Sequence, residues 1–320
     1  MESFRECMTD LSQQTQDIIM ASWSNNTIKS YNPYIKAWAR YCTYRNISHQ
    51  RAIRDIRLGI EFLTFLFSDL KLSYSAVNNA RSALSSFIIT GNELSFGKQP
   101  FVRQLLKGMF RIRPCLPRYT VTYDANVVLE YLRNQTVMTY KQLTLKLATL
   151  LALLTGSRNQ TLNTIDIDYI FVDSERMVIY IPEVLKTTTP NRHLEPLELK
   201  RYHDLSLCVV YHLELYVAFT HQLRPPNVRK LFIGLVQPHQ GVTTTTVGRY
   251  VKEVLKRAGI DTKTFSAHST RSASTSLVKQ KGLSLNEIRK AAGWTNCATF
   301  ARFYDKPISG PNFGQVMLQP

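Results

Sequence analysis

Residues 265–274 read FSAHSTRSAS, which places His268 and Arg271 three positions apart ahead of a run of small hydroxylated residues. With 7 histidines and 23 arginines in 320 residues, about half of one such His-x-x-Arg pair is expected by chance. The pair therefore indicates a functional site only if other groups suited to the same reaction stand elsewhere in the chain.

Two aromatic residues with polar atoms follow this stretch. Ser284 and Glu287 form a capping-box pattern that predicts a helix over LNEIRKAAG, and Gly293 can end that helix. Trp294 comes directly after the glycine, and Tyr304 ends the segment TFARFY. The Trp294 indole is a pure hydrogen-bond donor, and a tyrosine hydroxyl can act as a nucleophile.

A leucine-rich helix is predicted upstream of the same stretch. Residues 140–158 read YKQLTLKLATLLALLTGSR, with leucines along one face and Gly156 in place for a C-terminal cap. We expect this helix to be buried, and Arg158 follows its end.

Three segments after this helix predict strands. They are rich in β-branched and aromatic residues, and polar turns separate them. They read TIDIDYIFVD, RMVIYIPEVLK and RHLEPLEL, at residues 164–173, 176–186 and 192–199. We expect a small antiparallel sheet among helices, with Lys186 at the end of its second strand.

The first 112 residues predict helices only. Ser24 or Asn25 can cap the first long helix, whose apolar residues recur at helical spacing. The last helix of this part, FVRQLLKGMFRIR, is expected to bury one stripe of side chains. That stripe comprises Phe101, Leu105, Met109 and Ile112.

Pro114 and Pro117 stand close together and disfavour helix on both sides, which indicates a linker. The predicted fold is therefore mainly α with a small antiparallel β-sheet, in two domains. The parts are a helical domain at 1–113, a linker at 114–118, a second domain at 119–304 and a tail at 305–320.

The charge of the chain indicates a polyanionic partner. The 40 Lys and Arg residues exceed the 23 Asp and Glu residues by 17. The excess is 16 − 8 = 8 up to Arg118 and 24 − 15 = 9 after it, so both domains carry it. Nucleic acid is the partner that fits this balance best, although charge alone says nothing about a reaction.

Other classes of protein fit the sequence poorly. The 5 cysteines include no Cys-x-x-Cys pair, which argues against a zinc site and a disulfide framework and favours a reducing compartment. The longest strongly apolar run, LATLLALL, is too short to span a bilayer, and the N-terminus does not read as a signal peptide.

Taken singly, the residues picked out above have ordinary structural explanations. Arg158 and Lys186 can be solvated surface cations, Trp294 and Tyr304 can be core aromatics, and His268 can be a hydrogen-bonded structural histidine. Taken together, they describe the cleavage of a phosphodiester without water or metal.

In that reaction the tyrosine hydroxyl attacks phosphorus and cations hold the phosphate oxygens. Arg158 and Arg271 can bind the phosphate in a bidentate manner, and His268 can lie beside it. Trp294 can donate one more hydrogen bond to it, and His268 with the crowded cations can help to deprotonate Tyr304. The acid that protonates the leaving 5′ oxygen is Lys186, with Arg192 and His193 as alternatives.

At these residues the chain resembles a tyrosine recombinase of the phage-integrase family. The resemblance rests on the order Arg, Lys, His-x-x-Arg, Trp, Tyr and on the phrases LLALLTGSRNQTL, AHSTRSASTS, AAGW and FARFY. It covers residues 20 to 305, and LLKGMFRIRPCLPRY further resembles recombinases of eukaryotic mobile elements of the DIRS and Crypton kinds.

The resemblance implies a function and a site. It implies a two-domain clamp on double-stranded DNA, in which a helical core-binding domain and a catalytic domain hold the duplex. It implies catalytic roles for six residues and a covalent 3′-phosphotyrosine intermediate, without metal, cofactor, membrane or small-molecule substrate. Those residues are Arg158, Lys186, His268, Arg271, Trp294 and Tyr304.

Three features depart from the family pattern. Thr161 stands where an acidic residue is often found after the first arginine, and Trp294 replaces the commoner histidine. The gap between Trp294 and Tyr304 is one residue longer than usual, so that Phe303 falls where the tyrosine would. Phe303 has no nucleophile, so the extra residue must be absorbed before the last helix.

Larger-scale properties follow from the same resemblance. It implies four copies of the chain on two DNA sites, action in the nucleus of a eukaryotic host or otherwise in the cytoplasm, and a tail that docks on a neighbouring subunit. The alternative is a tail that lies on its own domain or frays. Two rival functions stay open: DNA relaxation by a type IB topoisomerase, and DNA binding by a domesticated protein that no longer cleaves.

Overall fold

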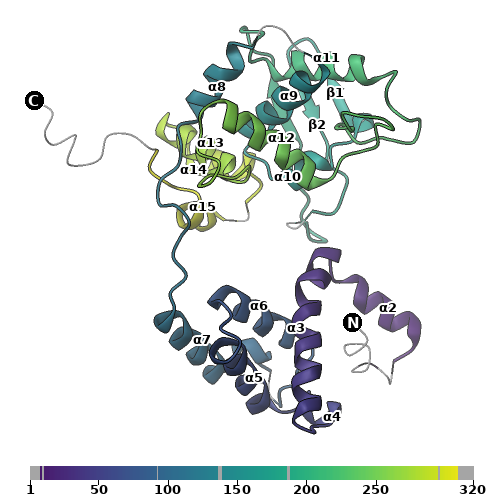
Figure 1. Ribbon diagram of the computed structural model, residues 1–320. Helices are drawn as coiled ribbons and strands as arrows, with labels where there is room; N and C mark the ends of the chain where they lie inside the picture. The colour runs from purple at the N-terminus through teal and green to yellow at the C-terminus, as the bar shows by residue number, and fades with distance from the viewer. Residues whose placement is uncertain are drawn as a thin grey trace, which may run out of the picture. The chain divides into compact units, whose positions relative to one another are not determined.

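The computed structural model describes residues 8, 11–91, 93–135, 139–185, 188–294 and 296–308 (Figure 1). The contacts between residues divide the chain into two compact units, Met1–Pro117 and Arg118–Pro320. Each unit has a hydrophobic core of its own. The predicted fold class is confirmed: the chain is mainly helical, and three short antiparallel strands lie in its second unit.

The first unit is helical throughout its described residues. Its elements are α2 (Gln13–Ala21), α3 (Asn25–Tyr44), α4 (His49–Ala52), α5 (Ile56–Ser68), α6 (Tyr74–Leu84), η2 (Phe96–Lys98) and α7 (Pro100–Ile112). The Ser24 side chain caps α3 by accepting a hydrogen bond from the Thr27 amide at 3.1 Å, as the sequence predicted. Trp38 of α3 and Phe62 of α5 meet in the core with their rings in a T-shaped arrangement.

The buried stripe of α7 differs from the predicted one. Val102, Leu106 and Met109 face the core, whereas Phe101 is 79% exposed and Ile112 is 73% exposed. Both stripes have helical spacing and differ by about one position, so spacing alone does not choose between them. Packing against α5, α6 and η2 determines which face is buried.

The second unit surrounds one leucine-rich helix. Its helices are α8 (Ala125–Arg133), α9 (Tyr140–Thr155), α10 (Asn159–Asn163), α11 (Val209–Thr220), α12 (Thr244–Arg257), α13 (Ser269–Gln280), α14 (Leu285–Ala291) and α15 (Cys297–Phe303). Helix α9 packs against α11, α12 and α13. Residues on all sides of α9 are therefore buried.

The sheet has the strand order β1-β2-β3, with both pairs antiparallel. The strands are β1 (Ile170–Val172), β2 (Arg176–Ile179) and β3 (Leu197–Lys200). All three are shorter than predicted. Pro182 has no amide hydrogen to continue the β2 ladder, Pro196 directly precedes β3, and a 3₁₀ turn, η3 (Ile167–Tyr169), precedes β1. Strand β2 ends at Ile179, and Lys186, which was predicted to end the second strand, lies outside the described residues.

Two ends of helices prepare the site. Gly156 ends α9 in the left-handed region, with φ of 56°, where a side chain would be strained. Gly293 has φ of 63° directly after α14, whose Ser284 and Glu287 form the predicted capping box. The chain therefore turns sharply just before Arg158 and just before Trp294.

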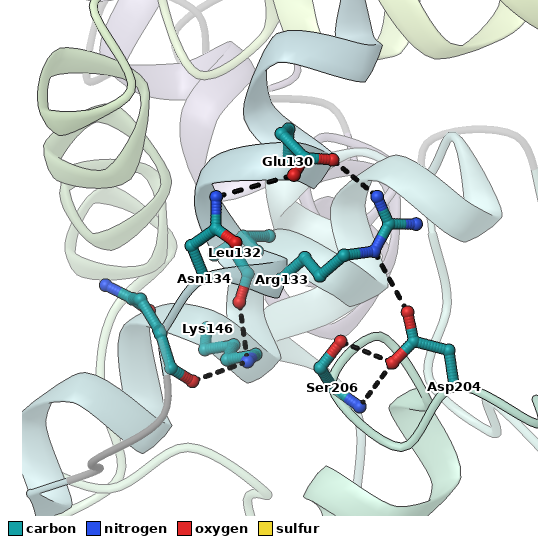
Figure 2. A network of polar contacts seen from close by, with 8 residues as sticks. Glu130, Leu132, Arg133, Asn134, Lys146, Asp204 and Ser206 are labelled. Atoms are coloured by element: carbon teal, nitrogen blue, oxygen red, sulfur yellow. Dashed lines mark hydrogen bonds and ion pairs between the residues drawn. The ribbon is translucent and has the colours of Figure 1, made fainter.

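One charged residue of the leucine-rich helix, Lys146, is buried (Figure 2). Lys146 is 0% exposed, and its ammonium group donates to the carbonyls of Leu132 at 2.7 Å and Gln135 at 3.3 Å. The Leu132 carbonyl lies in the last turn of α8 and also accepts a 3.3 Å hydrogen bond from the Gln135 amide, and Gln135 follows the end of that helix. Burial lowers the pKa of Lys146 from its ordinary value. Lys146 thus joins the end of α8 to α9.

Among the described residues, no helix is both long and apolar enough to cross a membrane.

Candidate active site

Helix α13 brings the two residues of the His-x-x-Arg pair to one site. His268 is the N-cap of α13, and Arg271 lies in its first turn. Arg271 is 2% exposed, and its two terminal nitrogens donate to the carbonyls of Gly156 at 2.5 Å and Ala292 at 2.6 Å. A single guanidinium group therefore joins the end of α9 to the end of α14.

Tyr304 lies directly beside this pair. Its hydroxyl is 3.2 Å from Nε2 of His268, within hydrogen-bonding distance. Its backbone carbonyl accepts hydrogen bonds from the hydroxyls of Ser272 at 2.9 Å and Ser276 at 2.8 Å. Helix α13 thus holds Tyr304 at both the main chain and the phenol.

Trp294 packs against both Arg271 and Tyr304, which also contact each other. The centre of its ring lies 4.3 Å from the guanidinium carbon of Arg271 and 4.8 Å from the centre of the Tyr304 ring. Within the described part of the chain, neither Nε1 of Trp294 nor Nε of Arg271 has a hydrogen-bond partner, although both atoms are buried. Buried donors are normally paired, so two neighbouring unpaired donors indicate a missing acceptor.

Arg158 supplies a second guanidinium group. It follows the Gly156 turn as the N-cap of α10 and is half-buried. It lines a small cavity together with Arg271, Thr161 and Leu194. No described residue gives its side chain a hydrogen bond or an ion pair, so its donors are available to a ligand.

The charges at this site disfavour further positive charge. Part of the His268 ring is exposed, yet the surrounding protein removes enough water to lower its pKa below the ordinary value of 6.5. The nearby charges of Arg271 and Arg158 lower it further. Burial, followed by the charge of Arg158, also lowers the pKa of Arg271. His268 is therefore neutral near pH 7 and can accept a proton, while the site attracts an anion.

The structure gathers five of the six residues singled out from the sequence. His268, Arg271, Trp294 and Tyr304 contact one another, and Arg158 shares a cavity with Arg271. The placement of Lys186 lies outside the described residues.

Three other residues of the site escaped sequence reasoning. Ser272 and Ser276 stand four positions apart on α13, a spacing that places both on one face. That spacing was the only signal for them. Arg192 was considered only as an acid, and it donates from Nη2 to the Trp294 carbonyl at 2.9 Å.

Where the structure describes the chain, it places no group of three or more His, Cys, Asp or Glu side chains so that they could hold a metal ion.

The chain is similar to known proteins in sequence and in fold. Residues 125–307 match the model of the phage integrase family, which is more than half of the chain. The chain belongs to the phage integrase family. The matched range contains all six singled-out positions and every element of the second unit from α8 to α15. No curated protein sequence matches this family member.

Solved structures of integrases and recombinases share the fold of this family member. The Tn1549 transposon integrase in complex with transposon right end DNA is 15% identical, with 95% of each chain covered and a TM-score of 0.60. The XerH site-specific recombinase, bound to palindromic difH substrate in a post-cleavage complex, is 19% identical. That match covers 85% of this chain and 74% of the other, with a TM-score of 0.59.

The lambda integrase dimer bound to a COC′ core site is a further structural match. It is 15% identical, covers 94% of this chain and 79% of the other, and has a TM-score of 0.53. Identities this low establish a shared fold.

Proposed function

We propose that this protein is a site-specific DNA recombinase that cleaves and rejoins DNA through a covalent 3′-phosphotyrosine at Tyr304. The observation that carries the proposal is the 3.2 Å contact between the Tyr304 hydroxyl and a His268 whose pKa is lowered. A neutral histidine at this distance can take the phenolic proton as the tyrosine attacks.

The cleavage step balances without an outside reactant. The Tyr304 oxygen bonds to phosphorus, the bond from phosphorus to the 5′ oxygen breaks, and His268 receives the phenolic proton. Arg158, Arg271 and the Trp294 N–H would hold the phosphate oxygens as charge builds on them. Attack by a 5′-hydroxyl from another strand reverses the step and reseals the DNA, so that no ATP is needed.

A proton must also reach the leaving 5′ oxygen. Arg192 is a poor donor for this step, because a guanidinium group stays protonated and this one is bonded to the Trp294 carbonyl. Lys186 remains our proposed general acid, with His193 as the alternative. The sequence places both on the connection between β2 and β3.

The partner and the setting are part of the proposal. Double-stranded DNA agrees with the net charge of +17 and with the DNA bound to the similar Tn1549 transposon integrase. We further propose that four protomers act on two DNA sites as the recombinase of a mobile element. We also propose a eukaryotic origin, and with it a location in the nucleus. This part rests on the resemblance of LLKGMFRIRPCLPRY to recombinases of eukaryotic mobile elements.

Covalent capture tests the proposed function without knowledge of the target site. The chain is incubated with nicked duplexes of random sequence. Cleavage close to a nick releases a short fragment that carries the 5′-hydroxyl, and without this hydroxyl the DNA cannot be rejoined. Protein that stays linked to DNA in detergent is recovered and the DNA is sequenced. We expect one recurring sequence with the unaltered chain and none with Tyr304→Phe, while both proteins bind the recovered duplex equally.

Two further assays separate the rival functions. A topoisomerase relaxes supercoiled plasmid lacking the recovered site, whereas a recombinase exchanges strands between two plasmids that carry it. A domesticated DNA-binding protein gives neither product and no covalent adduct.

A further inference from the structure

A second arginine braces the turn that carries Trp294. Nη2 of Arg192 donates to the Trp294 carbonyl at 2.9 Å, although the two residues are 102 positions apart in the sequence. Arg192 comes from the connection between β2 and β3, whereas Trp294 follows α14. This hydrogen bond therefore joins two segments that lie far apart in the sequence.

A close packing contact reinforces this hydrogen bond. A Cβ atom at position 293 would lie 2.6 Å from Cδ1 of Leu194, nearer than real Cβ contacts come. A side chain at position 293 would require the end of Leu194 to move, and the φ of 63° also favours a glycine there. The segment from Arg192 to Leu194 thus contacts the turn at Gly293 and Trp294 through one hydrogen bond and one apolar contact.

The position of this turn determines where the buried N–H of Trp294 points. Nε1 of Trp294 has no partner among the described residues, while the faces of the indole lie against Arg271 and Tyr304. We propose that Arg192 is a positioning residue, which holds Trp294 so that its free N–H points at the phosphate under attack. This inference rests on the proposed function, because the phosphate is the acceptor that the function supplies.

Loss of the Arg192 hydrogen bond should change the rate of cleavage rather than the stability of the fold. Release of the turn lets the indole drift, and displacement of about 1 Å in a reacting group can cost a factor of one hundred in rate. We therefore expect Arg192→Ala to slow single-turnover cleavage by about tenfold or more at saturating protein. DNA affinity and thermal stability should stay close to those of the unaltered chain. Arg192→Lys, which keeps one donor, should recover part of the rate.

A double-mutant cycle with Trp294→Phe tests the route of this effect. Phenylalanine keeps an aromatic ring in the site but removes the N–H, so no donor is left for Arg192 to direct. If Arg192 acts through that N–H, the double variant cleaves about as slowly as the slower single variant. Losses of rate that multiply in the double variant would overturn the proposal.

Arg289 provides the matched control for charge. It lines the same small cavity as Arg192 and Trp294, but its guanidinium group donates to the side chain of Asn286. Arg289→Ala therefore removes the same charge without loosening the turn, and its cleavage rate should stay near that of the unaltered chain. An equal loss in both variants would mean that Arg192 merely attracts DNA.

A modified substrate separates positioning of the donor from proton donation. A sulfur atom in place of the bridging 5′ oxygen leaves without a proton, since a thiol has a pKa of about 8.5. The Arg192→Ala defect should persist on this substrate, and its disappearance would assign Arg192 to the leaving group instead. Failure of the unaltered chain to form any adduct would overturn the proposed function, and this inference with it.

Discussion

The two arginines of the site have different structural roles. Arg271 is buried and holds two carbonyls, so it supports the fold as well as facing Tyr304. Arg158 is half-buried, and no described residue pairs with its side chain. The two arginines, which have equivalent roles in the proposed chemistry, are therefore not equivalent in structure.

Replacement of each arginine by alanine should separate its effect on the cleavage rate from its effect on stability. Arg158→Ala should slow cleavage by about one hundredfold, the range for losing one donor to the transition state, with unfolding unchanged. Arg271→Ala should slow cleavage at least as much and also lower the free energy of unfolding by about 2–4 kcal/mol, since it leaves buried carbonyls unpaired. Single-turnover kinetics and urea unfolding measure the two effects. Equal losses of stability would contradict this division.

The pH dependence of cleavage should report His268. Its pKa is lowered, so the neutral, proton-accepting form persists to a lower pH than in a free histidine. We expect a constant rate from about pH 8 down to about pH 6.5, followed by a fall at lower pH as His268 gains a proton. His268→Gln should be slower throughout and lack this fall. A fall centred above pH 6.5 would contradict the lowered pKa.

At the scale of elements, the ends of helices hold the second unit together. Lys146 joins α9 to the last carbonyls of α8, and nearby Arg133 binds Asp204 at 3.0 Å in the turn before α11 (Figure 2). The second pair is partly exposed and contributes little to stability. Lys146 is buried, so we expect the loss of its hydrogen bonds to cost more stability than the loss of the partly exposed pair.

Substitution of Lys146 by methionine should confirm this role. Methionine fills similar space but cannot donate, so the carbonyls of Leu132 and Gln135 lose the hydrogen bonds from Lys146. We expect the free energy of unfolding to fall by about 1–3 kcal/mol. Lys141→Met is the control, since it removes only a partly exposed ion pair with Glu253 and should cost less than about 1 kcal/mol. Equal effects in urea unfolding would contradict the assignment.

Local signals predicted local structure well. The capping box at Ser284 and the C-terminal cap at Gly156 were both evident from the sequence, because their chemistry involves neighbours in the chain. The strands were drawn too long because β-branched residues continue past Pro182. Contacts between distant segments, such as Arg192 with Trp294 or Lys146 with α8, follow no period and so could not be predicted.

At the scale of the whole molecule, the positive charge is the property that both units share. The excess is 15 − 8 = 7 over Met1–Pro117 and 25 − 15 = 10 over Arg118–Pro320, which predicts that each unit contacts phosphates. The logarithm of the association constant for DNA should therefore fall linearly with the logarithm of the salt concentration. With about six to ten phosphate contacts, the affinity should drop by a factor of about 10³–10⁵ between 50 and 200 mM salt. A nearly flat response in a titration followed by fluorescence anisotropy would argue against binding by both units.

The segment after Tyr304 links the site to the start of the second unit. The Pro307 carbonyl accepts a hydrogen bond from the Thr122 amide at 2.8 Å, and Lys306 donates to the Tyr119 carbonyl at 2.8 Å. Residues 305–308 therefore lie on their own domain. The apolar residues that we expect to dock on a neighbouring subunit, Phe313, Val316, Met317 and Leu318, lie outside the described residues.

Removal of residues 309–320 tests that docking while keeping the contacts of Lys306 and Pro307. We predict that binding to a single site survives, whereas the complex of four protomers on two sites is lost. Gel shift and sedimentation distinguish the two complexes. Normal assembly and recombination by the truncated chain would show that the tail has no such role.

The central claim is that Tyr304 becomes covalently linked to DNA, and identification of the linked residue tests it most directly. The captured adduct is digested with protease and nuclease, and the peptide bearing a nucleotide is sequenced by mass spectrometry. The account predicts a nucleotide attached through its 3′ phosphate to Tyr304, with a free 5′-hydroxyl on the released strand. A nucleotide on any other residue, a 5′ linkage, or no adduct on the recovered sequence would contradict it.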